Sequence, residues 1–113
     1  MKALSLAASA LAISLSALLA SAGHGPSLSA SEQHVVQMRG IAFEPRSVRA
    51  HVGDTIRWEN QDIVDHTASA RDRSFDVDAP AARSGTATMG AVGTYAYICR
   101  YHPNMTGEIV VEP

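Results

Sequence analysis

The chain has 113 residues, of which 46% are hydrophobic and 18% charged, and its formal net charge at neutral pH is −2. This length is enough for one small domain and no more. The sequence contains no run of basic residues, so it predicts no nucleic-acid partner, because such binding requires clustered positive charge. Cys99 is the only cysteine, which excludes a disulfide within the chain.

Residues 1–22 have the three parts of a secretory signal peptide. Lys2 supplies the positive charge, an apolar stretch follows, and the segment ends on Ala20-Ser21-Ala22. Serines interrupt the apolar stretch and weaken it as a permanent membrane span. We therefore predict cleavage after Ala22, a periplasmic mature chain and no stable membrane insertion after processing. An uncleaved N-terminal anchor is the alternative.

Residues 23–33 are rich in glycine, serine and proline and predict a flexible leader. The remaining residues, 34–113, form one domain of short apolar and polar alternations separated by turn residues, without a helical period. This pattern indicates an all-β antiparallel sandwich or barrel of about six to eight strands. The expected strands lie at 35–38 with a continuation to 43, and at 48–52, 55–60, 75–77, 86–89, 94–98 and 107–111.

The segment from Ala70 to Ala82 is charged and contains Pro80, so we expect it to be mostly loop. Several aspartates lie in and before this segment, and we interpret them as a solvated acidic stretch rather than a docking face. These residues are Asp62, Asp65, Asp72, Asp76 and Asp78.

The segment Cys99-Arg100-Tyr101-His102-Pro103-Asn104-Met105 places a thiolate, an imidazole and a thioether on one short loop. These ligand types suit copper in a trigonal site of two histidines and one cysteine with a weak axial methionine. The strand before the loop supports this interpretation. Alternate residues of a strand share one face, so Tyr95, Tyr97 and Cys99 point the same way, toward the core.

The second imidazole of such a site must come from elsewhere in the chain. His24 lies in the predicted leader, and His34 and His51 occupy strand positions that face outward. His66 follows a polar loop, and in an antiparallel sandwich it lies at the same end as Cys99. We therefore predict His66 as the missing ligand.

With these residues identified, the chain resembles the cupredoxins, the small type 1 blue copper proteins that include plastocyanin, pseudoazurin and amicyanin. The resemblance covers about Val35 to Glu112, and the Cys-x-x-His-Pro-x-Met loop is most similar to that of amicyanin. The other matching segments are Gly40-Ile41-Ala42-Phe43-Glu44-Pro45, Val52-Gly53-Asp54-Thr55-Ile56-Arg57-Trp58-Glu59-Asn60, His66-Thr67 and Gly93-Thr94-Tyr95-Ala96-Tyr97-Ile98-Cys99.

The resemblance implies a Greek-key β-sandwich and one copper ion per chain that cycles between Cu(II) and Cu(I). It makes His66, Cys99 and His102 the equatorial ligands and Met105 the axial ligand. Two features depart from amicyanin. Thr67 stands where amicyanin has an asparagine, and the segment between His66 and Cys99 is shorter.

The resulting expectation is a small exported electron shuttle, monomeric, that exchanges electrons with a c-type cytochrome or a periplasmic dehydrogenase. In the family the loop histidine is the exit for the electron, and His102 matches that position. Arg100 beside the site either steers an acidic partner or is a solvated loop charge. The alternative function is a periplasmic copper carrier or buffer that delivers copper to another protein through the same four ligands.

Other chemistries fit the sequence less well, and we expect no enzymatic activity. A thiol hydrolase built on Cys99 and His102 needs an oxyanion hole and an orienting partner, for which the sequence shows no motif. Methionine is not a usual zinc ligand, which disfavours a structural zinc site in the loop. A dinuclear copper centre requires a second cysteine, and a multicopper oxidase needs more than five histidines.

Overall fold

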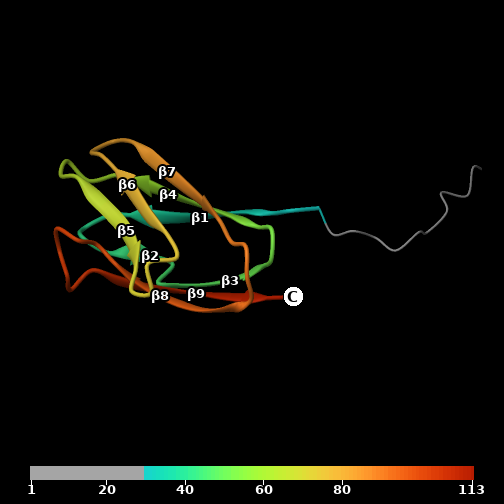
Figure 1. Ribbon diagram of the computed structural model, residues 1–113. Helices are drawn as coiled ribbons and strands as arrows, with labels where there is room; N and C mark the ends of the chain where they lie inside the picture. The colour runs from blue at the N-terminus through green and yellow to red at the C-terminus, as the bar shows by residue number, and fades with distance from the viewer. Residues whose placement is uncertain (1–29) are drawn as a thin grey trace, which may run out of the picture.

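The computed structural model describes residues 30–113, which form two packed β-sheets and contain no helix (Figure 1). The predicted signal peptide and residues 23–29 of the predicted leader lie outside the described residues. The all-β sandwich is confirmed, with nine strands rather than six to eight. Consistent with this, nothing in residues 30–113 forms a helix long and apolar enough to cross a membrane.

The first sheet has the strand order β2-β1-β4-β7. Its strands are β1 (Gln33–Met38), β2 (Phe43–Glu44), β4 (Thr55–Asn60) and β7 (Ser84–Thr88). The second sheet has the order β3-β9-β8-β5-β6. Its strands are β3 (Ser47–His51), β5 (His66–Ala70), β6 (Asp76–Ala79), β8 (Gly93–Ile98) and β9 (Thr106–Glu112). Both sheets are mixed rather than wholly antiparallel, because β1 pairs with β4, and β3 with β9, in parallel.

The core lies between the sheets, where the inward residues of each strand meet. Along β4 buried and half-buried residues alternate, and Ile56 and Trp58 are fully buried, as the alternation predicts. The Tyr97 ring packs edge-on against Phe43 and Trp58, at centroid distances of 4.6 and 5.6 Å. Such pairs are favoured by the quadrupoles of the rings and stiffen the interior.

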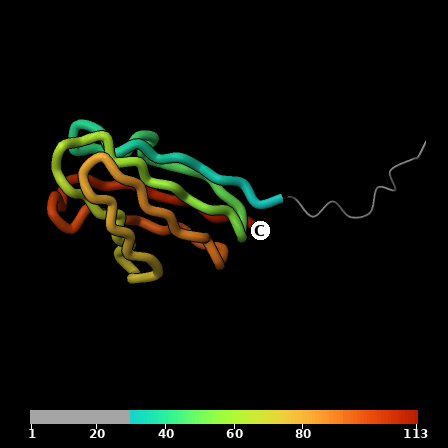
Figure 2. Tube along the Cα trace, turned by 90° about the horizontal axis from the view of Figure 1, so that it is seen from above, coloured from blue at the N-terminus to red at the C-terminus, as the bar shows by residue number. Residues whose placement is uncertain are grey.

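The strand register decides which loops share an end of the sandwich. Strand β8 runs from Gly93, opposite Val111, to Ile98, opposite Thr106. Cys99 therefore lies at one end, and His51, opposite Glu112, lies at the other. Figures 1 and 2 show the loop of residues 99–105, in red, far from the C-terminus and beside the yellow-green loop before β5.

The brief strand expected near 75–77 corresponds to β6, and most of the segment from Ala70 to Ala82 is loop as predicted, but β5, which forms a hairpin with β6, was not predicted. The sequence of β5, His-Thr-Ala-Ser-Ala, has only small residues of low contrast in hydrophobicity after His66, and all five residues are buried, so the pattern of a half-exposed strand is weak. A smaller difference concerns Val52. The expected strand at 48–52 ends one residue earlier, at His51, and Val52 is 45% exposed.

Candidate metal centre

Three of the predicted ligands, His66, Cys99 and His102, meet at one end of the sandwich. The Cys99 Sγ lies 3.8 Å from Nδ1 of His66 and 3.7 Å from Nδ1 of His102. The two imidazole rings are 5.1 Å apart between centroids and inclined at 69°. His66 and Cys99 are buried, whereas His102 is partly exposed. The arrangement therefore has a closed inner side and an open outer edge.

The loop that follows β8 is folded by its own backbone. The N–H of His102 donates to the carbonyl of Cys99 at 3.3 Å, and the N–H of Met105 donates to the carbonyl of His102 at 2.8 Å. The N–H of Cys99 in turn donates to the carbonyl of Met105 at 3.0 Å, which closes the loop just before β9 begins. Met105 is buried at the foot of this loop. Three predicted ligands are thus held by a seven-residue segment with paired ends.

Asp62 determines which nitrogen of His66 faces the sulfur. The Nε2 of His66 lies 2.7 Å from Oδ2 of Asp62. A carboxylate only accepts, so Nε2 carries the proton and Nδ1 keeps a free lone pair beside Cys99. A hydrogen bond of this kind fixes the tautomer and ring orientation of metal-ligating histidines.

Asp62 is itself fixed by the loop between β1 and β2. Its carboxylate accepts the N–H groups of Gly40 and Ile41 at 2.8 and 2.9 Å. Both residues have a left-handed backbone, with φ of +62° and +56°, a conformation that is costly for isoleucine. The hydrogen bond from His66, together with these two backbone bonds, outweighs the opposing effect of burial and holds the pKa of Asp62 below its usual range. The interpretation of Asp62 as part of a solvated acidic stretch is therefore wrong.

Thr67 joins the two segments that carry the ligands. Its N–H donates to Cys99 Sγ at 3.4 Å, and its hydroxyl oxygen accepts the N–H of Arg100 at 2.9 Å. A donor aimed at the sulfur stabilises negative charge there, which a metal-binding thiolate requires. Thr67, which stands where amicyanin has an asparagine, therefore connects the two segments through its own hydrogen bonds.

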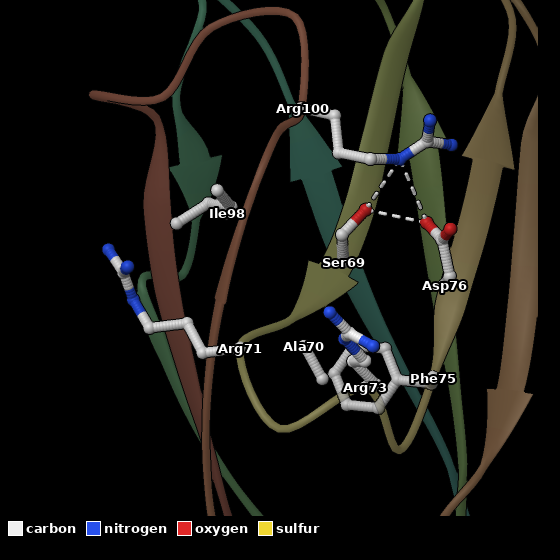
Figure 3. Close-up of a pocket in the computed structure, with 8 residues that line it drawn as sticks. All are labelled: Ser69, Ala70, Arg71, Arg73, Phe75, Asp76, Ile98 and Arg100. Atoms are coloured by element: carbon white, nitrogen blue, oxygen red, sulfur yellow. Dashed lines mark hydrogen bonds and ion pairs between the residues drawn. The ribbon is translucent and has the colours of Figure 1, made fainter.

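Arg100 lies across the outer face of β5 and β6, and its side chain is 48% exposed (Figure 3). Its guanidinium pairs with Asp76 at 3.2 Å and with Asp78 at 3.1 Å, and it donates to Ser69 Oγ at 3.3 Å. Asp76 and Asp78 are strand residues of β6 and not part of a solvated loop. These contacts cover β5 from outside and account for its burial on both faces.

The donor set fits a first-row metal ion that accepts nitrogen and sulfur ligands. Bond lengths of about 2.0–2.1 Å to imidazole and about 2.3 Å to thiolate, at angles near 115°, give N–S separations of about 3.7 Å. Both observed N–S separations agree with this value. Two imidazoles and one thiolate, with a methionine on the same loop, are the ligand types of blue copper sites.

The structure separates the candidate histidines between the two ends of the sandwich. His34 and His51 lie at the opposite end of the sandwich, beside Asp54, which leaves His66 as the partner of Cys99 and His102. Sequence reasoning missed the roles of Asp62 and Thr67. The only signal for Asp62 was its place four residues before His66, and that spacing alone is common.

Comparison with known proteins agrees with the geometry. Residues 8–111 match the family model of the cupredoxin-like domain. The chain is 33% identical to amicyanin-alpha of Methylorubrum extorquens over 122 aligned residues, which cover 99% of this chain and 100% of the relative. It is 31% identical to the amicyanin of Paracoccus denitrificans over 87 residues, which cover 69% of this chain and 64% of that protein.

Solved structures of amicyanin variants are similar to this chain in fold. An amicyanin variant in the Cu(I) form superposes with a TM-score of 0.61 and 26% identity, covering 69% of this chain and 80% of its own. A second, reduced variant gives a TM-score of 0.63, covering 71% and 82%. With the family model, the full-length relative and the fold in agreement, the chain belongs to the cupredoxin family and is amicyanin-like.

Proposed function

We propose that this chain is a blue copper electron shuttle with His66, Cys99 and His102 as equatorial ligands and Met105 as the axial ligand. The observation that carries the proposal is the convergence of two imidazole Nδ1 atoms on one buried sulfur. One copper ion per chain, cycling between Cu(II) and Cu(I), supplies the redox chemistry. As an amicyanin-like cupredoxin, the chain is an electron carrier and not an enzyme.

The residues of the chain keep the ligand positions constant. His66 cannot rotate without breaking its bond to Asp62, and Cys99 is tied to Thr67 and to Met105 by backbone N–H groups. A frame held in this way changes little between two oxidation states, which keeps the barrier to electron transfer low. The partly exposed ring of His102 is the route by which an electron leaves.

The surface around this end suits brief encounters with a redox partner. Ile63 is 96% exposed and Tyr101 58% exposed, and Ile41, Val64 and Pro103 add further exposed apolar surface on the adjoining loops. Small apolar patches of this kind mark interaction sites and fit weak, transient redox complexes. We infer that a c-type cytochrome or a periplasmic dehydrogenase docks here on a monomeric, exported chain.

The decisive test is to express residues 23–113, add Cu(II), and record visible and electron-spin spectra. We expect one equivalent of copper and an intense blue absorption that disappears in Cys99→Ser. His51→Ala, a histidine at the opposite end, is the matched control and should keep the colour. A colourless product, or colour that persists in Cys99→Ser, would contradict the proposal.

A copper carrier is the second candidate, because the exposed edge of His102 also gives an acceptor protein access to the site. The two functions differ in what leaves the protein. A shuttle retains copper through repeated oxidation and reduction, measured by metal analysis after many cycles with a soluble cytochrome. A carrier loses copper stoichiometrically to a periplasmic acceptor or a competing apo-protein.

A further inference from the structure

A second cluster of ligand-type side chains lies at the opposite end of the sandwich, where β1 begins and β3 turns into β4. Glu32, His34 and Asp54 each bring a ligand atom within 4.8 Å of the others. The Nε2 of His34 lies 2.9 Å from Oδ2 of Asp54, and Nδ1 of His51 lies 4.0 Å from the same oxygen. This end therefore gathers two imidazoles and two carboxylates.

Asp54 is the fixed member of the cluster. Its Oδ1 accepts the N–H of Glu32 at 2.9 Å, and its Oδ2 accepts the N–H of His51 at 2.8 Å. These bonds, led by that from Glu32, hold the pKa of Asp54 well below its usual range, so the carboxylate is ionised at neutral pH. A carboxylate oxygen has two lone pairs, and the lone pair of Oδ2 that the N–H of His51 does not occupy faces Nε2 of His34.

The other members can move toward this buried anchor. Glu32 and His51 are exposed, and His34 is partly exposed. Glu32, His51 and Asp54 line a cavity of about 230 Å³, which Ala30, Val52 and Pro113 complete. This volume is several times the share of one water molecule in the liquid, about 30 Å³, so it accommodates an ion with bound water.

We propose that Glu32, His34 and Asp54, with His51 beside them, form a second metal site for a divalent ion of the Zn²⁺ type. Imidazole and carboxylate together suit Zn²⁺, whereas Cu(I) prefers sulfur and Mg²⁺ and Ca²⁺ prefer oxygen alone. Two ligands at about 2.0–2.1 Å from one ion, at angles between 90° and tetrahedral, lie about 2.9–3.3 Å apart. The separation between His34 Nε2 and Asp54 Oδ2 falls in this range.

Such an ion joins two separate parts of the chain. Glu32 and His34 belong to the start of β1, and His51 and Asp54 to the turn between β3 and β4. Because the ion binds only the folded arrangement, it stabilises the fold in proportion to its concentration. No residue is shared with the Cys99 centre, so the two sites fill independently.

The test is a Zn²⁺ titration of the copper-loaded protein. Binding is measured by calorimetry, by the melting temperature and by the imidazole signals in nuclear magnetic resonance spectra. We expect one equivalent of Zn²⁺, a higher melting temperature, shifts confined to His34 and His51, and an unchanged blue absorption. Losing an outer-shell partner costs metal sites about 10–100-fold in affinity. The direct-ligand variants Glu32→Gln and His34→Gln should therefore weaken Zn²⁺ binding by about tenfold or more.

Matched controls keep the test independent of folding and of the copper centre. Glu108→Gln removes an exposed carboxylate from β9, and His24→Ala removes a histidine of the predicted leader, so neither should alter binding. Asp54 is left intact because it also holds the turn. Absence of binding at millimolar Zn²⁺ would overturn the proposal. Equal affinity in Glu32→Gln and His34→Gln, loss of binding in His24→Ala, or loss of blue colour on zinc uptake would do the same.

Discussion

The two ends of the sandwich contain the same arrangement of an aspartate, two backbone N–H groups and an imidazole. At the end that carries Cys99, Asp62 accepts hydrogen bonds from Gly40, Ile41 and His66, and at the far end Asp54 accepts them from Glu32, His51 and His34. The surroundings differ. The His66 side chain is 0% exposed, whereas that of His34 is 22% exposed.

What separates the two ends is the neighbour of the imidazole, not the aspartate. The Nδ1 of His66 faces a buried sulfur beside a second imidazole, whereas the ligand-type groups gathered with His34 are the carboxylates of Glu32 and Asp54. Asp62 therefore orients the predicted ligand His66 through the ring nitrogen that faces away from the sulfur, while at the far end Asp54 is itself a ligand in the proposed site. A hydrogen-bonded aspartate and histidine can thus belong to a site for a soft metal ion or for a harder divalent ion. The other ligand atoms nearby, sulfur or oxygen, decide which.

The core between the two ends should be the most sensitive part of the molecule. A Cβ on Gly107 would meet the Tyr97 ring at 2.4 to 2.8 Å, and a buried ring has nowhere to go. Gly107→Ala should lower the free energy of unfolding by about 3 kcal/mol or more, disturbing both ends together. Chemical denaturation measures this, with Gly90→Ala as the control because its Cβ meets nothing within 4 Å. Equal stability of the two variants would refute the packing argument.

Tyr97 also makes the shared core sensitive to alkali. Burial raises its pKa to about 12 from 10.0. The folded state therefore keeps the proton after the unfolded state has lost it, and stability falls as the pH rises through this window. We expect a loss of about 2–3 kcal/mol between about pH 10 and about pH 12. Denaturant titrations across this range should show the loss in the wild type and not in Tyr97→Phe.

Measurements of copper affinity can test whether Asp62 and Asp54 differ in their roles. Asp62→Asn removes the carboxylate that fixes the tautomer of His66, and we expect copper affinity to fall by about 10–100-fold. Asp54→Asn, the same change at the far end, should leave copper affinity unaltered. Competition with a chelator of known affinity gives both values. A similar loss in both variants would show that Asp62 acts through general stability.

Thr67 tests how firmly the two ligand segments are joined. Thr67→Val keeps the shape of the side chain and the N–H that faces Cys99, but it removes the acceptor for the N–H of Arg100. We expect a loss of about 1–2 kcal/mol in the free energy of unfolding while the blue colour remains. Thr88→Val, at an exposed position, should change stability by less than about 0.5 kcal/mol. Bleaching in Thr67→Val would instead make the hydroxyl essential to the site.

Substitution of Arg100 should have the smallest effect on stability among these variants. Its ion pairs with Asp76 and Asp78 lie on an exposed surface, so Arg100→Gln should cost less than about 1 kcal/mol. Because these aspartates already neutralise the guanidinium, we also expect little change in the rate of exchange with an acidic partner. Stopped-flow rates at low and high salt measure this. A large, salt-dependent fall in rate would restore a steering role for Arg100.

Local sequence patterns were enough for much of the fold and of the candidate site. The alternation in β4 predicts the burial of Ile56 and Trp58, because a pleated strand presents every second residue to one face. The spacing from Cys99 to His102 predicts their proximity, because three residues of a tight turn cannot separate them. His66 was predicted from the end of the sandwich on which its loop falls.

Tertiary packing decided the rest. Strand β5 escaped prediction because its small residues give little contrast in hydrophobicity, and the burial of its outer face depends on Arg100, from another strand end. Asp62 became a partner of His66 only because the loop between β1 and β2 supplies two N–H groups to hold it. A sequence determines contacts between neighbours along the chain, whereas contacts between distant segments depend on the strand order and register, which bring loops to a common end.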